Sequence, residues 1–272
     1  MLTRTVFYIS DQTGITAETL GHSLLTQFED VNFRAVTLPF IDTIDKAQEA
    51  CRRVNLTCEV EGSRPIVFST FVLDEIRDVI KQSNGLFLDF FDAFIGPLEK
   101  ELGRKSTHTT GKAHGLADSD NYSRRMEAVN FAVTYDDGVN LNGYSQAQAI
   151  LVGVSRCGKT PTCLYLALQH GVFAANYPLN EDDFEAGRLP RALEQNKDKL
   201  FGLTIESARL QQIREERRPD SRYASSRQVS YELRAAEALF RKYGVPHLNT
   251  THTSVEEIAA KVMAHMHLKR YE

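Results

Sequence analysis

The stretch that decides the fold is Gly153-Val154-Ser155-Arg156-Cys157-Gly158-Lys159-Thr160. It fits the phosphate-loop pattern G-x-x-x-x-G-K-[ST] without a mismatch. The apolar run at residues 149–152 before it predicts a buried strand, and residues 161–169 after it predict a buried helix. A strand, a glycine-containing loop and a helix in this order are typical of a P-loop in an α/β protein.

Such a loop is built to bind phosphate. Its glycines let the backbone curl so that successive N–H groups point at phosphate oxygens, and the helix N-terminus adds partial positive charge. Lys159 is predicted to reach the phosphates at the transferred end, and Thr160 to offer its hydroxyl to Mg²⁺. The alternative is a strand-to-helix turn with an incidental lysine. Because pattern and flanking elements agree, we favour a nucleotide site and a phosphotransferase.

Strands and helices alternate along most of the chain, which predicts parallel sheets covered by helices. Apolar runs predict strands at residues 5–10, 33–38, 65–69, 86–90, 148–154, 172–176, 200–205 and 245–249. Amphipathic stretches predict helices between them. The first predicted helix, residues 16–28, has an apolar face formed by Leu20, Leu24, Leu25 and Phe28.

The alternation is interrupted at residues 103–122, which are polar and have no apolar period. A structureless stretch of this length in a compact protein is a linker or a functional loop. We therefore predict two α/β domains. Residues 1–105 form an N-terminal domain with a mostly parallel sheet, and residues 106–272 form a C-terminal, kinase-like domain that binds a nucleotide at its P-loop.

The composition argues against a nucleic-acid-binding protein and against a membrane protein. Lys plus Arg total 32 against 36 Asp plus Glu, a net charge of −4, whereas nucleic-acid binding usually needs a basic excess. No stretch approaches the roughly 18 apolar residues of a membrane span. The four cysteines Cys51, Cys58, Cys157 and Cys163 include no CxxC pair. We expect a cytoplasmic protein with reduced thiols that binds neither nucleic acid nor membranes.

Two short motifs have alternative explanations. Residues 10–16 follow the first predicted strand, where ligands bind in open α/β sheets, but they also fit a capping turn with Thr13 or Thr16 as the cap. Asp136-Asp137-Gly138 could hold a metal or take a proton from an acceptor hydroxyl. It is also a common turn sequence.

Two further groups of residues also have both a functional and a structural explanation. Arg214, Arg217, Arg218, Arg222 and Arg227 could clamp phosphates or an incoming phosphoprotein segment, or could be a solvated helix end. The histidines show no metal-ligand spacing. Those in polar stretches, His114 and His252, are either surface residues or catalytic groups.

Several long motifs together resemble the bacterial phosphoenolpyruvate synthetase regulatory protein family, which is related to the plant pyruvate, phosphate dikinase regulatory proteins. The resemblance covers nearly the whole chain. Gln12 stands where the family pattern has a glycine, and it would be strained if that position needs a positive φ. The motifs are FYISD (7–11), TGITAE (13–18), MEAVNFA (126–132), DDG (136–138), ILVGVSRCGKTPT (150–162), ANYPL (175–179) and KLFGLTI (199–205).

This resemblance implies a bifunctional enzyme. One activity is an ADP-dependent Ser/Thr kinase that phosphorylates a threonine of the synthetase, or of the dikinase, and so inactivates it. The other is a phosphate-dependent phosphorylase that removes the group and forms pyrophosphate. The resemblance also implies that the eight residues of the P-loop, 153–160, bind ADP.

Physical reasoning adds roles to this expectation. Since transfer from ADP leaves AMP, the loop has to hold the β-phosphate, and inorganic phosphate is expected in the same cradle in the reverse reaction. Lys159 would neutralise charge in both directions, and Asp137 is the candidate base. No acidic residue after the strands that follow the loop stands out as a second Mg²⁺ ligand.

Other readings of the sequence stay open. A P-loop kinase acting on a small metabolite and a non-enzymatic nucleotide sensor are the alternatives to a protein kinase. The bacterial-type motifs favour the synthetase as the target, with the dikinase as the alternative. Since most soluble oligomers are symmetric dimers, we also expect a homodimer.

Overall fold

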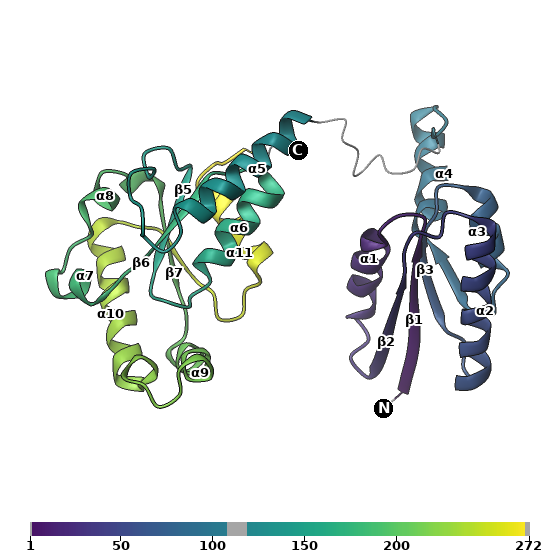
Figure 1. The fold of residues 1–272 in the computed structure, drawn as a ribbon, viewed down its shortest axis with the longest axis horizontal. Coiled ribbons are helices and arrows are strands. Elements are labelled where there is room, and N and C mark those ends of the chain that lie inside the picture. Colours follow the sequence, from purple (N-terminus) through teal and green to yellow (C-terminus); the bar gives the residue numbers. More distant parts are fainter. Residues whose placement is uncertain (1, 108–118, 270–272) are drawn as a thin grey trace. The chain divides into compact units, whose positions relative to one another are not determined.

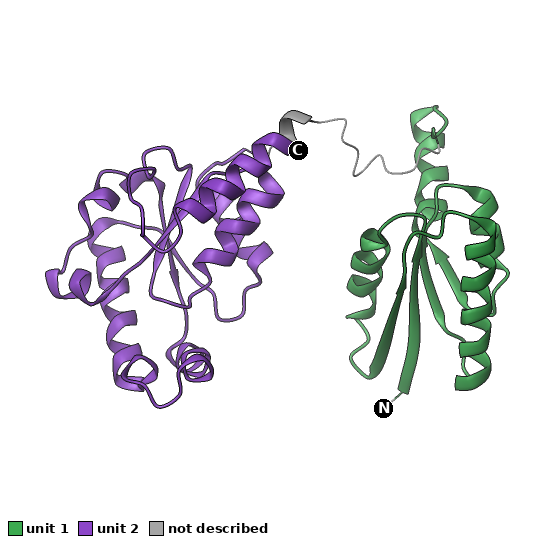
Figure 2. Ribbon diagram, viewed as in Figure 1, with its two compact units in different colours: residues 1–115 green, residues 116–272 purple. Residues whose placement is uncertain are grey.

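The chain forms two compact units, residues 1–115 and residues 116–272, which are described separately (Figure 2). A computed structural model describes residues 2–107 and 119–269, and side chains from residue 122 onward in the second range. His114 and most of the predicted linker lie outside the described residues. Each unit contains one four-stranded sheet in which all neighbouring strands are parallel. The predicted α/β class is confirmed.

The N-terminal unit has a sheet of order β2-β1-β3-β4 with helices on both faces (Figure 1). Successive side chains of β1 point to opposite faces. Phe7 and Ile9 therefore join the core under α2 and α3, while Val6 and Tyr8 join the core under α1. The elements are β1 (Leu2–Ser10), α1 (Ile15–Leu25), β2 (Val31–Leu38), α2 (Ile44–Glu61), β3 (Ile66–Thr70), α3 (Asp74–Lys81), β4 (Leu86–Asp89) and α4 (Phe90–Leu102).

Helix α1 packs through a face that includes only one of the apolar residues predicted to lie there, Leu25. Leu25 is buried, but Leu20, Leu24 and Phe28 are 43%, 51% and 59% exposed. The helix contacts the sheet through Ala17, Gly21 and Leu25 instead. A Cβ added to Gly21 would lie 2.6 Å from the rings of Tyr8 and Phe68. These large rings therefore require small residues on the packed face of the helix.

The C-terminal unit has a sheet of order β6-β5-β7-β8, in which α5, α6 and α11 lie on one face and α10 lies on the other (Figure 1). Two short helices, α7 and α8, lie in a stretch for which no element was predicted. The elements are α5 (Ser119–Thr134), β5 (Ala149–Gly153), α6 (Lys159–His170), β6 (Ala174–Pro178), α7 (Glu181–Ala186), α8 (Arg191–Glu194), a 3₁₀ turn (Lys197–Lys199), β7 (Leu200–Thr204), α9 (Ser207–Arg217), a 3₁₀ turn (Arg222–Ala224), α10 (Ser226–Tyr243), β8 (His247–Asn249) and α11 (Val255–His265).

Local sequence signals explain where several helices begin and end. Helix α6 ends at Gly171, whose φ of 60° places it in the left-handed region that favours glycine. Helix α11 begins with the predicted capping box of Ser254 and Glu257. None of the described helices combines the length and the apolar character needed to cross a membrane.

The strand order places the P-loop where a ligand site is expected. In the order β6-β5-β7-β8 the chain leaves the central strand β5 toward one edge and later returns to the other side of it. In open α/β sheets the loops diverge at this reversal and ligands bind at the carboxyl ends of the strands. The loop that follows β5 lies at this reversal.

We predict that Gly153→Ala destabilises the C-terminal unit. A Cβ at residue 153 would lie 2.3 Å from the carbonyl oxygen of Leu203 and 2.9 Å from Sγ of Cys157, so β7 or the loop has to move. Overpacking of this kind lowers the free energy of unfolding by about 1–3 kcal/mol. Urea denaturation followed by circular dichroism measures the change. Gly96→Ala in α4, which meets no atom within 4 Å, is the control, and an equal effect of both substitutions would contradict the prediction.

Candidate functional site

The P-loop joins the end of β5 to the first turn of α6. Arg156 has a φ of 77° and Gly158 a φ of 94°, so the backbone turns through left-handed conformations twice within three residues. No described residue accepts a hydrogen bond from the backbone N–H groups of Ser155, Arg156 or Gly158. Free N–H groups at a helix N-terminus form a binding site for an anion. This geometry fits the predicted phosphate cradle.

Lys159 is folded over the loop and is only 4% exposed. Its Nζ donates a hydrogen bond to the carbonyl of Val154 at 2.8 Å. Nζ also donates to Sγ of Cys157 at 4.0 Å, and since an ammonium group carries three protons, one remains for a bound anion. The neighbouring Cys157 also donates to this carbonyl, at 3.0 Å. Burial raises the pKa of the Cys157 thiol, so we assign it a packing role and not that of a nucleophile.

Thr160 pairs with Asp136, a residue of the Asp136-Asp137-Gly138 motif that the sequence analysis considered for metal binding but did not connect with Thr160. Its hydroxyl donates to Oδ1 of Asp136 at 2.8 Å, and the amide of Asn176 donates to the same oxygen. No described residue donates to Oδ2 of Asp136. The pairing is not readable from the sequence, because Asp136 lies in the connection between α5 and β5 and reaches Thr160 only through the fold.

A hydroxyl beside a carboxylate fits the requirements of Mg²⁺. This ion binds oxygen ligands and is commonly held by one or two carboxylates together with substrate phosphates and water. Among residues 2–107 and 119–269 no three His, Cys, Asp or Glu side chains cluster as a metal site. Thr160 and Asp136 therefore fit a Mg²⁺ ion that binds together with a nucleotide.

Asp137 lies beside the loop in a different setting from Asp136. Its backbone N–H donates to Oδ1 of Asn176 at 3.2 Å, and its φ of 51° is unusual for a residue other than glycine. The residue is exposed. It lines a cavity of about 470 Å³, the Asp137 cavity, whose walls include Ser155 of the P-loop, Tyr177 and Tyr223. The predicted base thus faces open space next to the loop.

Tyr177 forms a fixed wall of this cavity. Burial and then the charge of Asp183 raise the pKa of Tyr177 to about 12, so the phenol keeps its proton at neutral pH. It donates to Oδ2 of Asp183 at 3.2 Å, while that carboxylate also accepts from the backbone N–H of Asn180 in the capping box of α7. The start of α7 is therefore tied to the cavity wall.

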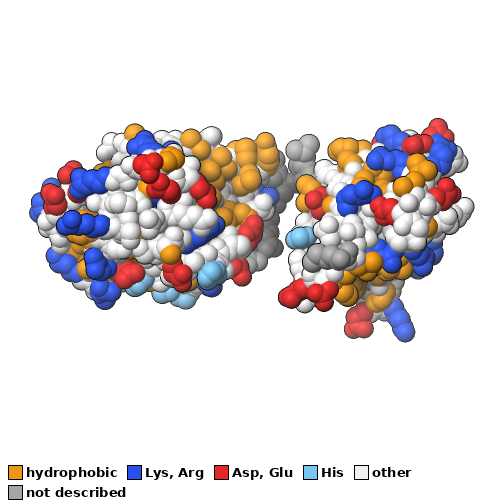
Figure 3. Space-filling model, turned by 90° about the horizontal axis from the view of Figure 1, so that it is seen from below, with side chains coloured by type: hydrophobic (Ala, Val, Ile, Leu, Met, Phe, Trp, Pro, Cys, Tyr) orange, Lys and Arg blue, Asp and Glu red, His pale blue; other side chains and the backbone are white. Residues whose placement is uncertain are grey.

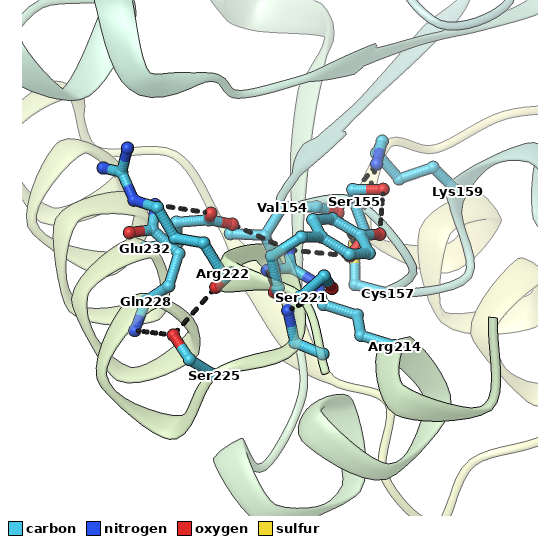
Figure 4. A network of polar contacts seen from close by, with 12 residues as sticks. Val154, Ser155, Cys157, Lys159, Arg214, Ser221, Arg222, Ser225, Gln228 and Glu232 are labelled. Carbon is cyan, nitrogen blue, oxygen red and sulfur yellow. Dashed lines mark hydrogen bonds and ion pairs between the residues drawn. The ribbon is translucent and has the colours of Figure 1, made fainter. Parts of the chain in front are cut away.

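Below the loop, the buried side chain of Arg214 connects three segments (Figure 4). Its guanidinium donates to the carbonyl of Ser155 at 3.2 Å, to the carbonyl of Tyr223 at 3.1 Å and to Oε2 of Glu232 at 2.7 Å. It also lies 4.2 Å from the ring centroid of Tyr223. The hydroxyl of Tyr223 in turn lies 2.9 Å from that of Ser155. Ser155 of the loop is therefore held through its carbonyl by Arg214 and through its hydroxyl by Tyr223.

The five arginines considered as a phosphate clamp have different roles. Arg214 supports the loop and is inaccessible to a ligand. Arg217 and Arg218 are exposed at the end of α9 and fit the solvated-helix alternative. Arg222 forms an ion pair with Glu181, and it lines a second cavity together with Arg227.

The other candidate residues lie outside this arrangement. In the N-terminal unit, Asp11 is buried at the carboxyl end of β1, accepts from the N–H of Val72 at 3.3 Å, and has its pKa raised by burial. Neither threonine caps α1, since Gly14 is the N-cap residue with a φ of 80°. Gln12 has no positive φ, so the strain considered for it does not occur. His252 is exposed before α11.

We predict that Arg214→Ala destabilises the C-terminal unit by about 3–5 kcal/mol, because the change leaves Glu232 and two carbonyls without their buried partner. Nucleotide affinity should fall as the P-loop loses its support. Urea denaturation and calorimetric titration with ADP measure the two effects. Arg217→Ala, three residues further along the same helix but exposed, should change stability by less than about 0.5 kcal/mol. Similar effects of both substitutions would contradict the assigned role.

Known proteins align with this chain over nearly its full length. A relative from Stutzerimonas stutzeri (strain A1501) is 54% identical over 267 residues, and relatives from Pseudomonas fluorescens (strain Pf0-1) and Legionella pneumophila (strain Corby) are 52% and 51% identical. Each alignment covers 98% of both chains, and each relative is named "putative phosphoenolpyruvate synthase regulatory protein". The sequence profile of the kinase/pyrophosphorylase family matches residues 6–263. The chain belongs to this kinase/pyrophosphorylase family.

Proposed function

We propose that this protein regulates phosphoenolpyruvate synthase by two opposed reactions at the P-loop. In one, a phosphoryl group passes from ADP to a threonine of the synthase; in the other, inorganic phosphate removes it. The observation that carries the proposal is the juxtaposition of a phosphate cradle, Lys159 and the Thr160–Asp136 pair with the cavity that Asp137 lines. Family membership supports the chemistry, and the names of the relatives support the partner.

In the forward direction the cradle would hold the β-phosphate of ADP. The threonine hydroxyl, placed in the Asp137 cavity, gives its proton to Asp137 as its oxygen bonds to phosphorus. The bond from phosphorus to the bridging oxygen breaks, and AMP leaves. The loop N–H groups and Lys159 stabilise the charge that builds up on the transferred group. Thr160 and Asp136 would hold Mg²⁺, which when bound neutralises charge on the phosphate oxygens.

In the reverse direction inorganic phosphate would occupy the same cradle. One of its oxygens bonds to the phosphorus of phosphothreonine, the threonine oxygen leaves and takes a proton back from Asp137, and pyrophosphate is released. The two directions need the same stabilisation of a transferred phosphoryl group. One set of donors can therefore serve both.

The first test compares phosphoryl donors and acceptors. Incubation with phosphoenolpyruvate synthase should transfer radiolabel from [β-³²P]ADP to a threonine of the synthase, with no transfer from γ-labelled ATP. Pyruvate, phosphate dikinase serves as a second acceptor. Transfer to a small metabolite in place of either protein would overturn the proposal and favour a metabolite kinase.

We predict that Lys159→Ala abolishes transfer in both directions while the protein stays folded. The substitution removes the cation from the cradle without touching the acceptor cavity. Kinase and phosphorylase rates are measured with labelled ADP and by pyrophosphate release, and circular dichroism checks the fold. Lys197→Ala, an exposed lysine outside the site, is the control. If Lys159→Ala still regulates the synthase, the protein is a nucleotide sensor that acts by binding.

We predict different losses for the two adjacent aspartates. Asp137→Asn should lower the kinase rate by about 10²–10⁴-fold with ADP affinity retained, as expected for loss of a general base. Asp136→Asn should instead raise the Mg²⁺ concentration needed for half-maximal rate, because its carboxylate pairs with Thr160. Initial rates over a Mg²⁺ titration separate the two effects. The assignment fails if the two variants lose activity in the same way.

A further inference from the structure

A second cavity adjoins the Asp137 cavity on the side away from the P-loop. It measures about 650 Å³ and shares Glu181 and Gln228 with the walls of the Asp137 cavity. No residue of the loop lines it, whereas Ser155 lines the Asp137 cavity. We call it the arginine cavity; its walls are formed by Glu181, Arg222, Ser225, Arg227, Gln228, Tyr231 and Arg234.

The charges of the two cavities differ in sign. In the Asp137 cavity, Glu232 is committed to Arg214 and Gln228, so Asp137 carries the free negative charge. In the arginine cavity, Glu181 compensates Arg222. Arg227 and Arg234 have no carboxylate partner among the described residues, and Arg234 donates only to the carbonyl of Ser230. Two uncompensated guanidinium groups therefore face the arginine cavity.

These two arginines are presented by one rigid element. Arg227 and Arg234 are seven residues apart on α10, which is close to two helical turns, so they lie on the same side of the helix. Both are exposed. Lys and Arg side chains gather at the end of the C-terminal unit that carries α7 and α10 (Figure 3). Guanidinium groups in this arrangement favour a carboxylate or another planar or tetrahedral anion.

We propose that the arginine cavity binds an anionic side chain of the partner's acceptor segment, a few residues from the hydroxyl that Asp137 receives. This inference rests on the proposed function. The nucleotide does not account for the arginine cavity, because the phosphates are expected at the P-loop, and no P-loop residue lines this cavity. An extended segment lying through both cavities meets Asp137 at one end and two free cations at the other. The position of the anion then sets which hydroxyl enters the site.

The experiment compares two double charge reversals. Arg227→Glu with Arg234→Glu inverts the arginine cavity. Arg217→Glu with Arg218→Glu makes the same charge change at the exposed end of α9, outside both cavities. Binding of phosphoenolpyruvate synthase is measured by biolayer interferometry, and ADP affinity by calorimetry. The milder pair Arg227→Gln with Arg234→Gln keeps the test valid if the reversal fails to fold.

We expect the cavity variants to bind the synthase at least about tenfold more weakly, as for loss of charge-assisted hydrogen bonds. Their ADP affinity and that of the control pair should stay within about twofold of wild type. In the kinase assay the KM for the synthase should rise while kcat at saturation stays near wild type.

Three results would overturn the inference. These are unchanged synthase binding by the cavity variants, an equal loss in the control pair, and a parallel loss of ADP affinity, which would assign the cavity to the nucleotide. Failure of the proposed function is a separate result. It would appear as a wild-type protein that binds the synthase without transferring phosphate from ADP, and the binding comparison would still decide what the arginine cavity holds.

Discussion

The guanidinium of Arg214 is the interaction on which the site depends. A fully buried cation is costly unless each of its neighbours is a partner, and here the neighbours are the carbonyl of Ser155, the carbonyl and ring of Tyr223, and the carboxylate of Glu232. Each belongs to a different segment. The P-loop, the turn before α10 and α10 itself are therefore connected through one group.

Backbone strain is placed at the same edge of the sheet. Arg156 at the tip of the loop and Asp137 beside the cavity both have positive φ values, which cost energy in residues other than glycine. The surroundings hold each of them: Asn176 binds the N–H of Asp137, and Arg214 anchors the residue before Arg156. Strain maintained in this way fixes the loop backbone before a ligand arrives, with the N–H groups of Ser155, Arg156 and Gly158 left without an acceptor among the described residues.

The P-loop and the α/β class were predictable because both are encoded by neighbouring residues: a contiguous pattern for the loop and an alternation of apolar runs for the sheets. The partner of Thr160 was not, because Asp136 reaches it only through the fold of the α5–β5 connection. The burial of Arg214 was equally hidden: Leu210 and Ile213 mark an inner face on α9, but an arginine beside them is not expected to be fully buried. For α1, the leucines suggested the packed face, but of these only Leu25 is buried, and the rings of Tyr8 and Phe68 leave no room for a Cβ at Gly21.

If the site carries out both proposed reactions, with different phosphate compounds, it cannot gain its selectivity for the protein partner from the phosphate cradle alone. In the proposed function the cradle would meet phosphate oxygens in either direction, and its N–H groups and Lys159 would interact with them through charge. Discrimination has to come from groups that contact the protein partner and that are unaffected by whether the threonine is phosphorylated. The walls of the arginine cavity meet this requirement, because no P-loop residue lines that cavity. A recognition surface built there would serve both reactions without favouring either.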